Sequence, residues 1–279
     1  MAQEMTRYKF NKSKSYPSIN TVKPHQIDIG FEWEIQTKCN YSALPRKEYY
    51  AVRERAYEYG FAITTLTAKF IEAYNFKTHG ECMAGEFCSP VAHRLDTIKA
   101  IAKKLQRRAS KEKYLVPDQC QMAGIHVHTS IKTKSASAHS GMFKKIILML
   151  NRESSKDFVW AFSGRDKATT SGYKYQAVAT CWDTGSDKAR RYAYGDARGT
   201  GMVRLNSFSN QKTIEYRLFN GTSDRMQPAL EFAHACTKFV SQQKGVDVPY
   251  LKDFKTWLFK QKGYKLLKCV FNVVCFLFI

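Results

Sequence analysis

Several stretches of the chain alternate apolar and polar residues, the pattern of a β-strand that packs one face against a core. Residues 26–36 show this pattern without a break. Their apolar positions are Ile27, Ile29, Phe31, Trp33 and Ile35, and their polar face carries Asp28, Gly30, Glu32 and Glu34. The stretch therefore predicts a half-buried strand with two glutamates side by side.

Four shorter stretches predict strands of the same kind, over residues 85–89, 124–132, 202–208 and 213–219. Each places two polar side chains on one face, with an apolar residue between them. In chain order these pairs are Glu86 and Cys88, His126 and His128, Arg204 and Asn206, and Glu215 and Arg217. Acids, imidazoles and arginines are thus concentrated on the polar faces of strands.

Helical spacing of apolar residues predicts four helices, over residues 45–59, 91–113, 140–151 and 223–243. The helix over 91–113 would turn a basic ridge outward. The cations of this ridge are Lys99, Lys103, Lys104, Arg107, Arg108 and Lys111. The chain is therefore expected to contain both strands and helices.

The last eleven residues, Cys269 to Ile279, are apolar apart from Asn272. They are too few to cross a bilayer, which takes about 20 helical residues. We expect a terminal strand or helix packed on the core, with an interfacial anchor or a partner contact as alternatives. A membrane is therefore not expected as a partner except through this segment.

Composition supports a folded core, since 44% of the residues are hydrophobic and 14% aromatic. Without repeats or low-complexity linkers, residues 24–279 are expected to form one domain, preceded by a flexible basic N-terminal arm over residues 1–23. The eight cysteines contain no C-x-x-C pair and follow no secretory signal. They indicate reduced thiols and a cytoplasmic protein.

The formal net charge of +21 indicates attraction to polyanions such as nucleotides, nucleic acid or anionic lipid. In a chain with such an excess of lysine and arginine, acidic residues on the polar faces of the strands are unexpected. Adjacent Glu32 and Glu34 repel each other unless a cation lies between them. Carboxylates with imidazole suit Mg²⁺ or Mn²⁺, and Arg204 and Arg217 suit phosphate. The pattern therefore predicts a metal–nucleotide site.

Five sequence blocks resemble the amidoligase family of the glutamine-synthetase-like carboxylate–amine ligases. They are G-F-E-W-E at 30–34, G-E-F-C-S-P at 85–90, A-G-I-H-V-H at 123–128, R-L-N at 204–206 and T-I-E-Y-R-L-F-N-G-T at 213–222. The blocks occur in the order typical of that family, and the first and last are the most specific. In spacing, the resemblance covers roughly residues 25 to 240.

This resemblance implies an α+β fold, in which a curved antiparallel sheet forms an active-site funnel and helices pack outside. It implies an enzyme that binds ATP and two or three divalent ions, and that joins a carboxylate substrate to an amine, in a peptide or protein or in a small molecule, through an acyl phosphate. The implied metal ligands are Glu32, Glu34, Glu86, His126 and Glu215. The implied nucleotide and phosphate contacts are Arg204, Asn206, Arg217 and His128. Of these residues, Glu34, Glu215, Arg204, Arg217 and His128 are the implied catalytic set.

The chain departs from the family before the second block. An Asp followed by Gly-Ser is usual there, but this chain has Lys77-Thr78-His79-Gly80-Glu81. The ligands of a third metal are therefore left open, with His79 and Glu81 as candidates. No residue in the sequence is singled out to take the proton from the amine.

Other interpretations of the same residues are possible. A zinc site from His79, Cys82, Cys88 and His93 has suitable ligand types, but its spacing matches no common zinc module. Cys88 paired with a distant histidine would suit a thiol hydrolase, although a small buried residue explains it more simply.

A nucleic-acid-binding protein is the main alternative to a ligase, and a ligase whose acceptor is linked to nucleic acid would combine the two. The N-terminal arm, the ridge over 99–113 and the arginines of residues 184–201 would supply the charge. In that last segment Tyr192 and Tyr194 are interleaved with Arg190, Arg191 and Arg198, which suits single strands. The same segment would equally suit a loop over a nucleotide.

Overall fold

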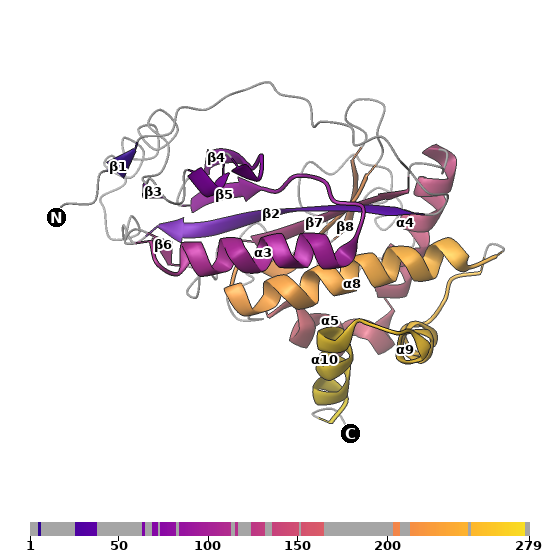
Figure 1. Cartoon of the computed structure of the whole chain (residues 1–279). Helices are drawn as coiled ribbons and strands as arrows, with labels where there is room; N and C mark the ends of the chain where they lie inside the picture. The colour runs from indigo at the N-terminus through magenta and orange to yellow at the C-terminus, as the bar shows by residue number, and fades with distance from the viewer. Residues whose placement is uncertain are drawn as a thin grey trace, which may run out of the picture.

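The computed structural model describes residues 5–6, 26–37, 63–64, 69–71, 73–81, 84–112, 115–116, 124–131, 136–150, 152–164, 203–206, 213–244 and 247–276. Within them an antiparallel sheet of seven strands is the central element (Figure 1). Its strands are β4 (Lys77–Glu81), β5 (Ala84–Cys88), β2 (Ile27–Thr37), β7 (Gly124–Ile131), β9 (Thr213–Asn220) and β8 (Val203–Asn206) in spatial order, with β6 (Leu115–Val116) also pairing with β2. A separate pair joins β1 (Met5–Thr6) to β3 (Ile63–Thr64).

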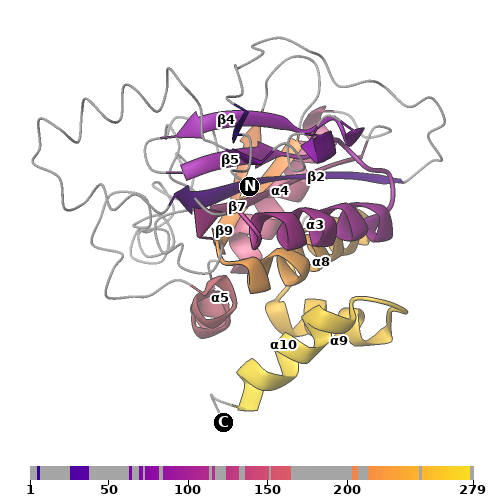
Figure 2. The same ribbon diagram turned by 60° about the vertical axis from the view of Figure 1, so that its left-hand side comes forward.

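Two long helices, α3 (Leu95–Ala109) and α8 (Ser223–Gln242), lie along one face of this sheet (Figures 1 and 2). They cover the apolar positions predicted for β2, and all five of those side chains are buried. The Trp33 indole N–H donates to the Gly221 carbonyl at 2.8 Å, which ties β2 to the turn before α8. The polar face of the sheet therefore points away from α8.

A buried hydroxyl network fixes the register between the sheet and α8. The Thr237 hydroxyl on α8 lies 2.7 Å from the Thr129 hydroxyl on β7 and 2.8 Å from the Tyr216 hydroxyl on β9. All three side chains are buried, so each contact satisfies a group that would otherwise have lost its water. Sliding α8 along the sheet would break the network.

The remaining helices surround α8. Helices α4 (Ala136–Leu150) and α5 (Lys156–Ser163), the latter after the short 3-10 turn η2 (Glu153–Ser155), also contact strands of the sheet. Helices α9 (Leu251–Lys260) and α10 (Lys265–Phe276) follow α8 in the chain. Phe232 of α8 contacts the rings of Phe158, Phe162, Phe219 and Phe254. Figures 1 and 2 both place α9 and α10 on the far side of α8 from the sheet.

Three of the predicted helices are confirmed, with altered ends. The helix expected to begin at residue 91 begins at Leu95, because Ala92 exchanges backbone hydrogen bonds with Ile29 and is held extended. The helix expected to begin at 140 begins at Ala136. Helices α5 and α9 were not predicted, and residues 269–276 of the terminal segment belong to a helix that begins at Lys265. The helix predicted over 45–59 lies outside the described residues, as does the N-terminal arm except for β1.

The predicted basic ridge of α3 is only partly exposed. Lys103, Lys104 and Arg107 face solvent. Lys99 is wrong as a ridge residue, because its ammonium group binds the Glu231 carboxylate on α8. Arg108 is half-buried, with its guanidinium 5.9 Å from the centre of the Phe70 ring.

Strict alternation also fails near the end of β9. The pairing of β7 with β9 shifts register between Ile125 and Val127, which is a β-bulge with one extra residue on β9. Alternation alone would put Phe219 on the face opposite Tyr216. The bulge returns Phe219 to the core, where both rings contact Phe232.

Glu231 joins three helices although it lies in the core. One carboxylate oxygen accepts from the Lys99 ammonium on α3, and the other accepts from the Leu267 backbone N–H at 2.9 Å, in the first turn of α10. An anion there satisfies an amide that has no partner within its own helix. In the part of the chain that the structure describes, no helix is long and apolar enough to cross a membrane.

Replacing Glu231 by alanine should therefore lower the free energy of unfolding by about 2–3 kcal/mol, since it breaks a largely buried ion pair and leaves an amide unsatisfied. Urea unfolding would measure this loss, and hydrogen exchange should show faster exchange at the Leu267 amide. Lys103→Ala on the exposed side of α3 is the control and should change stability by less than about 0.5 kcal/mol. A Glu231→Ala protein as stable as this control would contradict the assignment.

Candidate metal centre

Four neighbouring strands, β5, β2, β7 and β9, bring the predicted metal ligands to one place on the polar face of the sheet. The strand register sets Glu34 opposite Glu86 and Glu32 opposite His126. On the other side of β7, His128 stands opposite Glu215. Residues directly opposite in antiparallel strands have neighbouring side chains, so the pairing itself builds the cluster.

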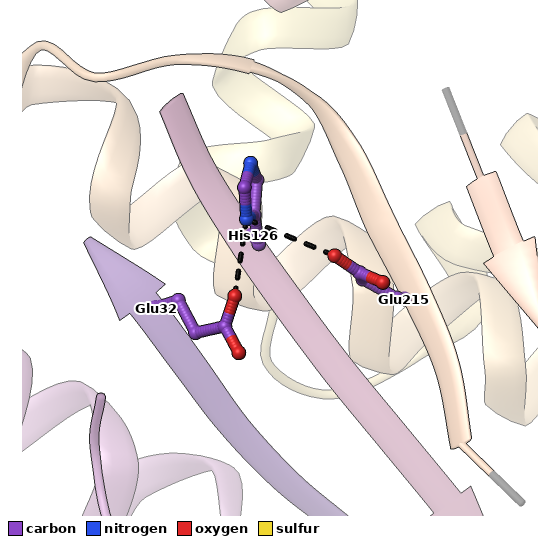
Figure 3. A group of neighbouring side chains, drawn as sticks. All are labelled: Glu32, His126 and Glu215. Atoms are coloured by element: carbon purple, nitrogen blue, oxygen red, sulfur yellow. Dashed lines mark hydrogen bonds and ion pairs between the residues drawn. The ribbon is translucent and has the colours of Figure 1, made fainter. Parts of the chain in front are cut away.

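His126 lies at the middle of this cluster (Figure 3). Its Nδ1 is 3.1 Å from Glu32 Oε2 and 3.7 Å from Glu215 Oε1, and its Nε2 is 3.8 Å from Glu34 Oε1. The imidazole is thus surrounded by carboxylates from two different strands.

Most of the cluster is buried, although the alternating pattern predicts a polar face exposed to solvent. The buried members are Glu34, Glu86, His126 and Glu215. Glu32 is the more open member, with 30% of its side chain exposed. One Glu34 oxygen accepts from the Gly124 backbone N–H at 2.6 Å. Burying several carboxylates together is costly unless positive charge is bound among them.

Positive charge comes partly from His128 and Arg217. His128 Nε2 forms an ion pair with Glu32 Oε1 at 3.2 Å, and Arg217 Nη1 donates to Glu215 Oε1 at 2.6 Å. Arg217 keeps 24% of its side chain exposed, so its guanidinium is both held by Glu215 and open to a ligand.

These contacts shift the pKa values of the cluster. Burial would raise the pKa of Glu32, but its contacts with His126 and His128 outweigh burial and lower that pKa. Burial would likewise raise the pKa of Glu215, and the charges of His128, Arg217 and His126 lower it instead. Burial would lower the pKa of His128, but Glu32 and Glu215 raise it. The two glutamates are therefore held as anions, the form that binds cations.

Three overlapping groups of side chains have the geometry to hold a cation. Their potential ligand atoms lie within 4.8 Å of one another in each group. The groups are Glu32, His126 and Glu215; Glu34, Glu86 and His126; and Glu32, Glu86 and Cys88. All five predicted ligands fall within these groups. The first two contain only carboxylate oxygens and an imidazole, a donor set that fits Mg²⁺ or Mn²⁺.

The predicted phosphate ligands Arg204 and Asn206 lie on β8, at the edge of the sheet. Arg204 stands opposite Glu215 and Asn206 opposite Thr213 in the register. Their side chains lie outside the described part of the structure, as do those of His79 and Glu81 on β4. The arginine-rich segment over 184–201 also lies outside it.

The zinc alternative is not supported where it can be followed. Cys88 is opposite Glu32, whereas the His93 ring contacts Asp28. Because Asp28 and Glu32 are four residues apart on β2, about 13 Å of extended strand separates the two positions. Cys88 and His93 therefore cannot share one ion, and Cys88 is a buried cysteine beside the acidic cluster.

An Asp–His pair on the same sheet face was missed by the sequence interpretation. His93 Nδ1 lies 2.5 Å from Asp28 Oδ1, while its Nε2 is buried without a hydrogen-bond partner among the described residues. Asp28 is opposite Ser130, one alternation beyond the pair formed by Gly30 and His128. Asp28 was visible on the polar face of the predicted strand, but nothing in the pattern indicated that His93 would meet it.

Comparison with known proteins yields no matching family model and no matching curated protein. Three solved structures are similar to the chain: a bifunctional glutathione synthetase from Pasteurella multocida (10% identity, TM-score 0.45), the complex of the prokaryotic ubiquitin-like protein Pup with its ligase PafA (9%, 0.38) and a Plasmodium falciparum glutamine synthetase (12%, 0.41). The similar regions cover 83%, 77% and 79% of this chain but 39%, 46% and 53% of the other chains, respectively. This chain thus spans only about half of those proteins.

The geometry predicts that divalent cations stabilise the protein through Glu34. At a Mg²⁺ or Mn²⁺ concentration 100 times its dissociation constant, the free energy of unfolding should rise by about 2.7 kcal/mol. Glu34→Gln keeps an acceptor for the Gly124 amide but loses the charge, so most of the gain should vanish. Thermal unfolding with the metal and with a chelator measures the difference.

Asp247→Asn is the matched control, because it removes the same charge from an exposed position outside the cluster. It should keep the full metal-dependent gain. An equal gain in Glu34→Gln and in the unmodified protein would rule out Glu34 as a ligand.

Proposed function

We propose that the protein is an ATP- and Mg²⁺-dependent carboxylate–amine ligase that forms an amide or isopeptide bond. The observation that carries this proposal is the largely buried cluster of four glutamates around His126, beside Arg217, on the polar face of one sheet. Such a cluster suits two or three divalent ions, and the arginine suits a polyphosphate. Four of the five sequence blocks that resemble the amidoligases contribute these residues.

In this proposal Glu32 and Glu34 hold separate metal ions, Glu86 supports one of them, and His126 with Glu215 completes the other. When bound, the ions neutralise the charge that develops on the transferred phosphoryl group. The polar face of the sheet would form the floor of an active-site funnel. Residues 24–279 would form one catalytic domain, preceded by a basic arm, and the protein would act in the cytoplasm.

The phosphate contacts in the proposal are Arg204, Asn206, Arg217 and His128. Arg217 is the best supported, since Glu215 fixes its guanidinium and raises its pKa against the effect of burial. A guanidinium that is permanently charged and already oriented can stabilise a phosphoryl group without reorganising.

The reaction would proceed in two displacements. An oxygen of the substrate carboxylate attacks the γ-phosphorus of ATP, and the bond to the bridging oxygen breaks to release ADP. The amine nitrogen then attacks the carbonyl carbon of the acyl phosphate, and the C–O bond breaks to release phosphate. The nitrogen must lose one proton in this second step.

His93 is our candidate for accepting that proton. Its Nδ1–H donates to the Asp28 carboxylate, an arrangement that leaves the lone pair on Nε2. That atom is buried and has no hydrogen-bond partner in the described part of the chain, a costly arrangement that substrate binding would relieve. Asp28 lies on the face that carries the acidic cluster, about 7 Å along β2 from the position of Gly30 beside His128.

A nucleic-acid-binding function has less support. In the described part of the chain it depends on the exposed cations of α3, and Lys99 and Arg108 no longer belong to that exposed ridge. It predicts salt-sensitive nucleic-acid binding that is unaffected by changes at Glu34 or Glu215. A ligase with a nucleic-acid-linked acceptor would show this binding together with nucleotide turnover.

The ligase proposal predicts ADP release that requires Mg²⁺, a carboxylate and an amine. Glu34→Ala and Glu215→Ala should each lower kcat by at least about 100-fold, because each removes charge stabilisation from the phosphoryl transfer. A coupled ADP assay over a panel of carboxylates and amines measures this, with Asp247→Ala as an unaffected control. Absence of both Mg²⁺-dependent nucleotide binding and ADP release would refute the proposal.

The role of His93 can be tested separately from phosphoryl transfer. Hydroxylamine traps acyl phosphates as hydroxamates and is largely unprotonated at neutral pH, so it needs little help from a base. His93→Gln should keep hydroxamate formation within about threefold of the unmodified enzyme but lose about 100-fold in amide formation with ordinary amines. Equal losses with both nucleophiles would show a structural role instead.

A further inference from the structure

Helix α10 carries apolar side chains on two faces. Its inner face packs into the protein, where Leu267 and Phe271 are buried. The Phe271 ring stacks on Phe158 with a centroid distance of 4.1 Å and also contacts Phe254. This inner face is enough to explain why the helix docks onto the rest of the fold.

The outer face has a second apolar stripe, formed by Leu266, Cys269, Val270 and Val273. Their spacing of three, four and seven residues places them along one side of a helix. Leu266 is 42% exposed and Val273 60% exposed, while Val270 is half-buried. A helix that packs by one face normally presents polar residues on the other, so this stripe calls for a partner.

The charge around the stripe identifies the chemistry of that partner. From Phe254 to Ile279 the sequence contains five lysines and no acidic residue. Lys260, Lys262 and Lys265 are exposed, and they lie where α9 leads into α10. Phe259, in the same region, is also exposed. An apolar stripe flanked by lysines complements a surface that is apolar inside and anionic outside.

We infer that the outer face of α10 docks on an anionic lipid bilayer, with the helix lying in the plane of the interface. The apolar stripe would enter the boundary between headgroups and acyl chains, and the lysines would meet anionic headgroups. Two copies of the chain joined through this face would bring like charges together. A nucleic acid would satisfy the lysines but not the exposed leucine and valine. The bilayer satisfies both.

This surface lies away from the proposed catalytic site. Figures 1 and 2 place α10 on the far side of α8 from the sheet, and the acidic cluster is on the sheet face that points away from α8. Membrane docking would therefore leave the metal centre open to soluble substrates. The inference does not depend on the proposed ligase activity, because it uses none of the residues of that site.

Vesicle flotation with the full chain tests the inference. Vesicles of phosphatidylcholine with phosphatidylserine should bind the protein at low salt, binding should weaken as salt is raised, and vesicles of phosphatidylcholine alone should bind at least tenfold less. The double variant Leu266→Ser, Val273→Ser should lower binding to the anionic vesicles at least tenfold. Lys260→Gln, Lys262→Gln and Lys265→Gln should each lower it about fivefold.

Matched controls come from elsewhere on the surface. Leu148→Ser removes an equally exposed apolar side chain from α4, and a triple change of Lys103, Arg107 and Lys111 to glutamine removes exposed cations from α3 and the residues after it. Both controls should bind anionic vesicles like the unmodified chain. Equal binding by the Leu266 and Val273 double variant would overturn the inference. So would a dimer, seen by analytical ultracentrifugation, that this double variant abolishes.

A second measurement does not depend on loss of binding. Tryptophan at position 273 (Val273→Trp) should shift its fluorescence to shorter wavelength on anionic vesicles and be quenched by lipids with brominated acyl chains. Tryptophan at position 148 (Leu148→Trp) should show neither change. Unchanged fluorescence at position 273 with vesicle-bound protein would show that α10 does not enter the bilayer.

Discussion

A carboxylate that is buried away from water needs a positive charge beside it, and several buried carboxylates meet around His126. Glutamates from β2 and β9 approach its ring, with further acids next to them. The arrangement exists only while β5, β2, β7 and β9 keep their register, since a shift of one residue would turn every acid toward the core. The candidate metal centre therefore depends on what fixes the sheet, and the sheet is fixed from its opposite face.

That opposite face is where most of the stabilising contacts lie. Trp33 bonds to the turn before α8, and Tyr216 shares a hydroxyl network with Thr129 and Thr237. In their strands, Trp33 lies between Glu32 and Glu34, Tyr216 follows Glu215, and Thr129 follows His128. Because neighbouring residues of a strand point to opposite faces, tight packing of one residue against α8 fixes the position of the adjacent carboxylate on the other face.

Alternation is also why much of the site could be predicted from the sequence. Glu32, Glu34, His126 and Glu215 stand at alternate positions in segments whose apolar partners are unambiguous, so their shared faces follow from local sequence. Which strands would be neighbours does not follow from it, because pairing depends on contacts between distant segments. The bulge in β9 was equally hidden, since an extra residue in one strand leaves the local pattern of apolar residues nearly unchanged.

The features that were missed depend on tertiary contacts. His93 meets Asp28 because Ala92 pairs with Ile29, a contact that also delays the start of α3. Helix α10 begins at Lys265, and Glu231 on α8 accepts from a backbone amide in the first turn of α10. The apolar run at the end of the chain could therefore not predict where this helix begins. A single buried acid in the middle of a helix has no local signature of such a role.

The distribution of charge gives the net value of +21 a more specific meaning. Several of the 24 acidic residues are buried, namely Asp28, Glu34, Glu86, Glu112, Glu215 and Glu231. The described surface is therefore more basic than the composition alone indicates. A basic exterior attracts polyanions from a distance, whereas an acidic cluster behind it binds only cations that reach it. A metal–polyphosphate complex carries both kinds of charge. Its phosphates can be attracted by the basic exterior while its cation is attracted by the acidic cluster, a combination that neither a free metal ion nor a free nucleotide offers.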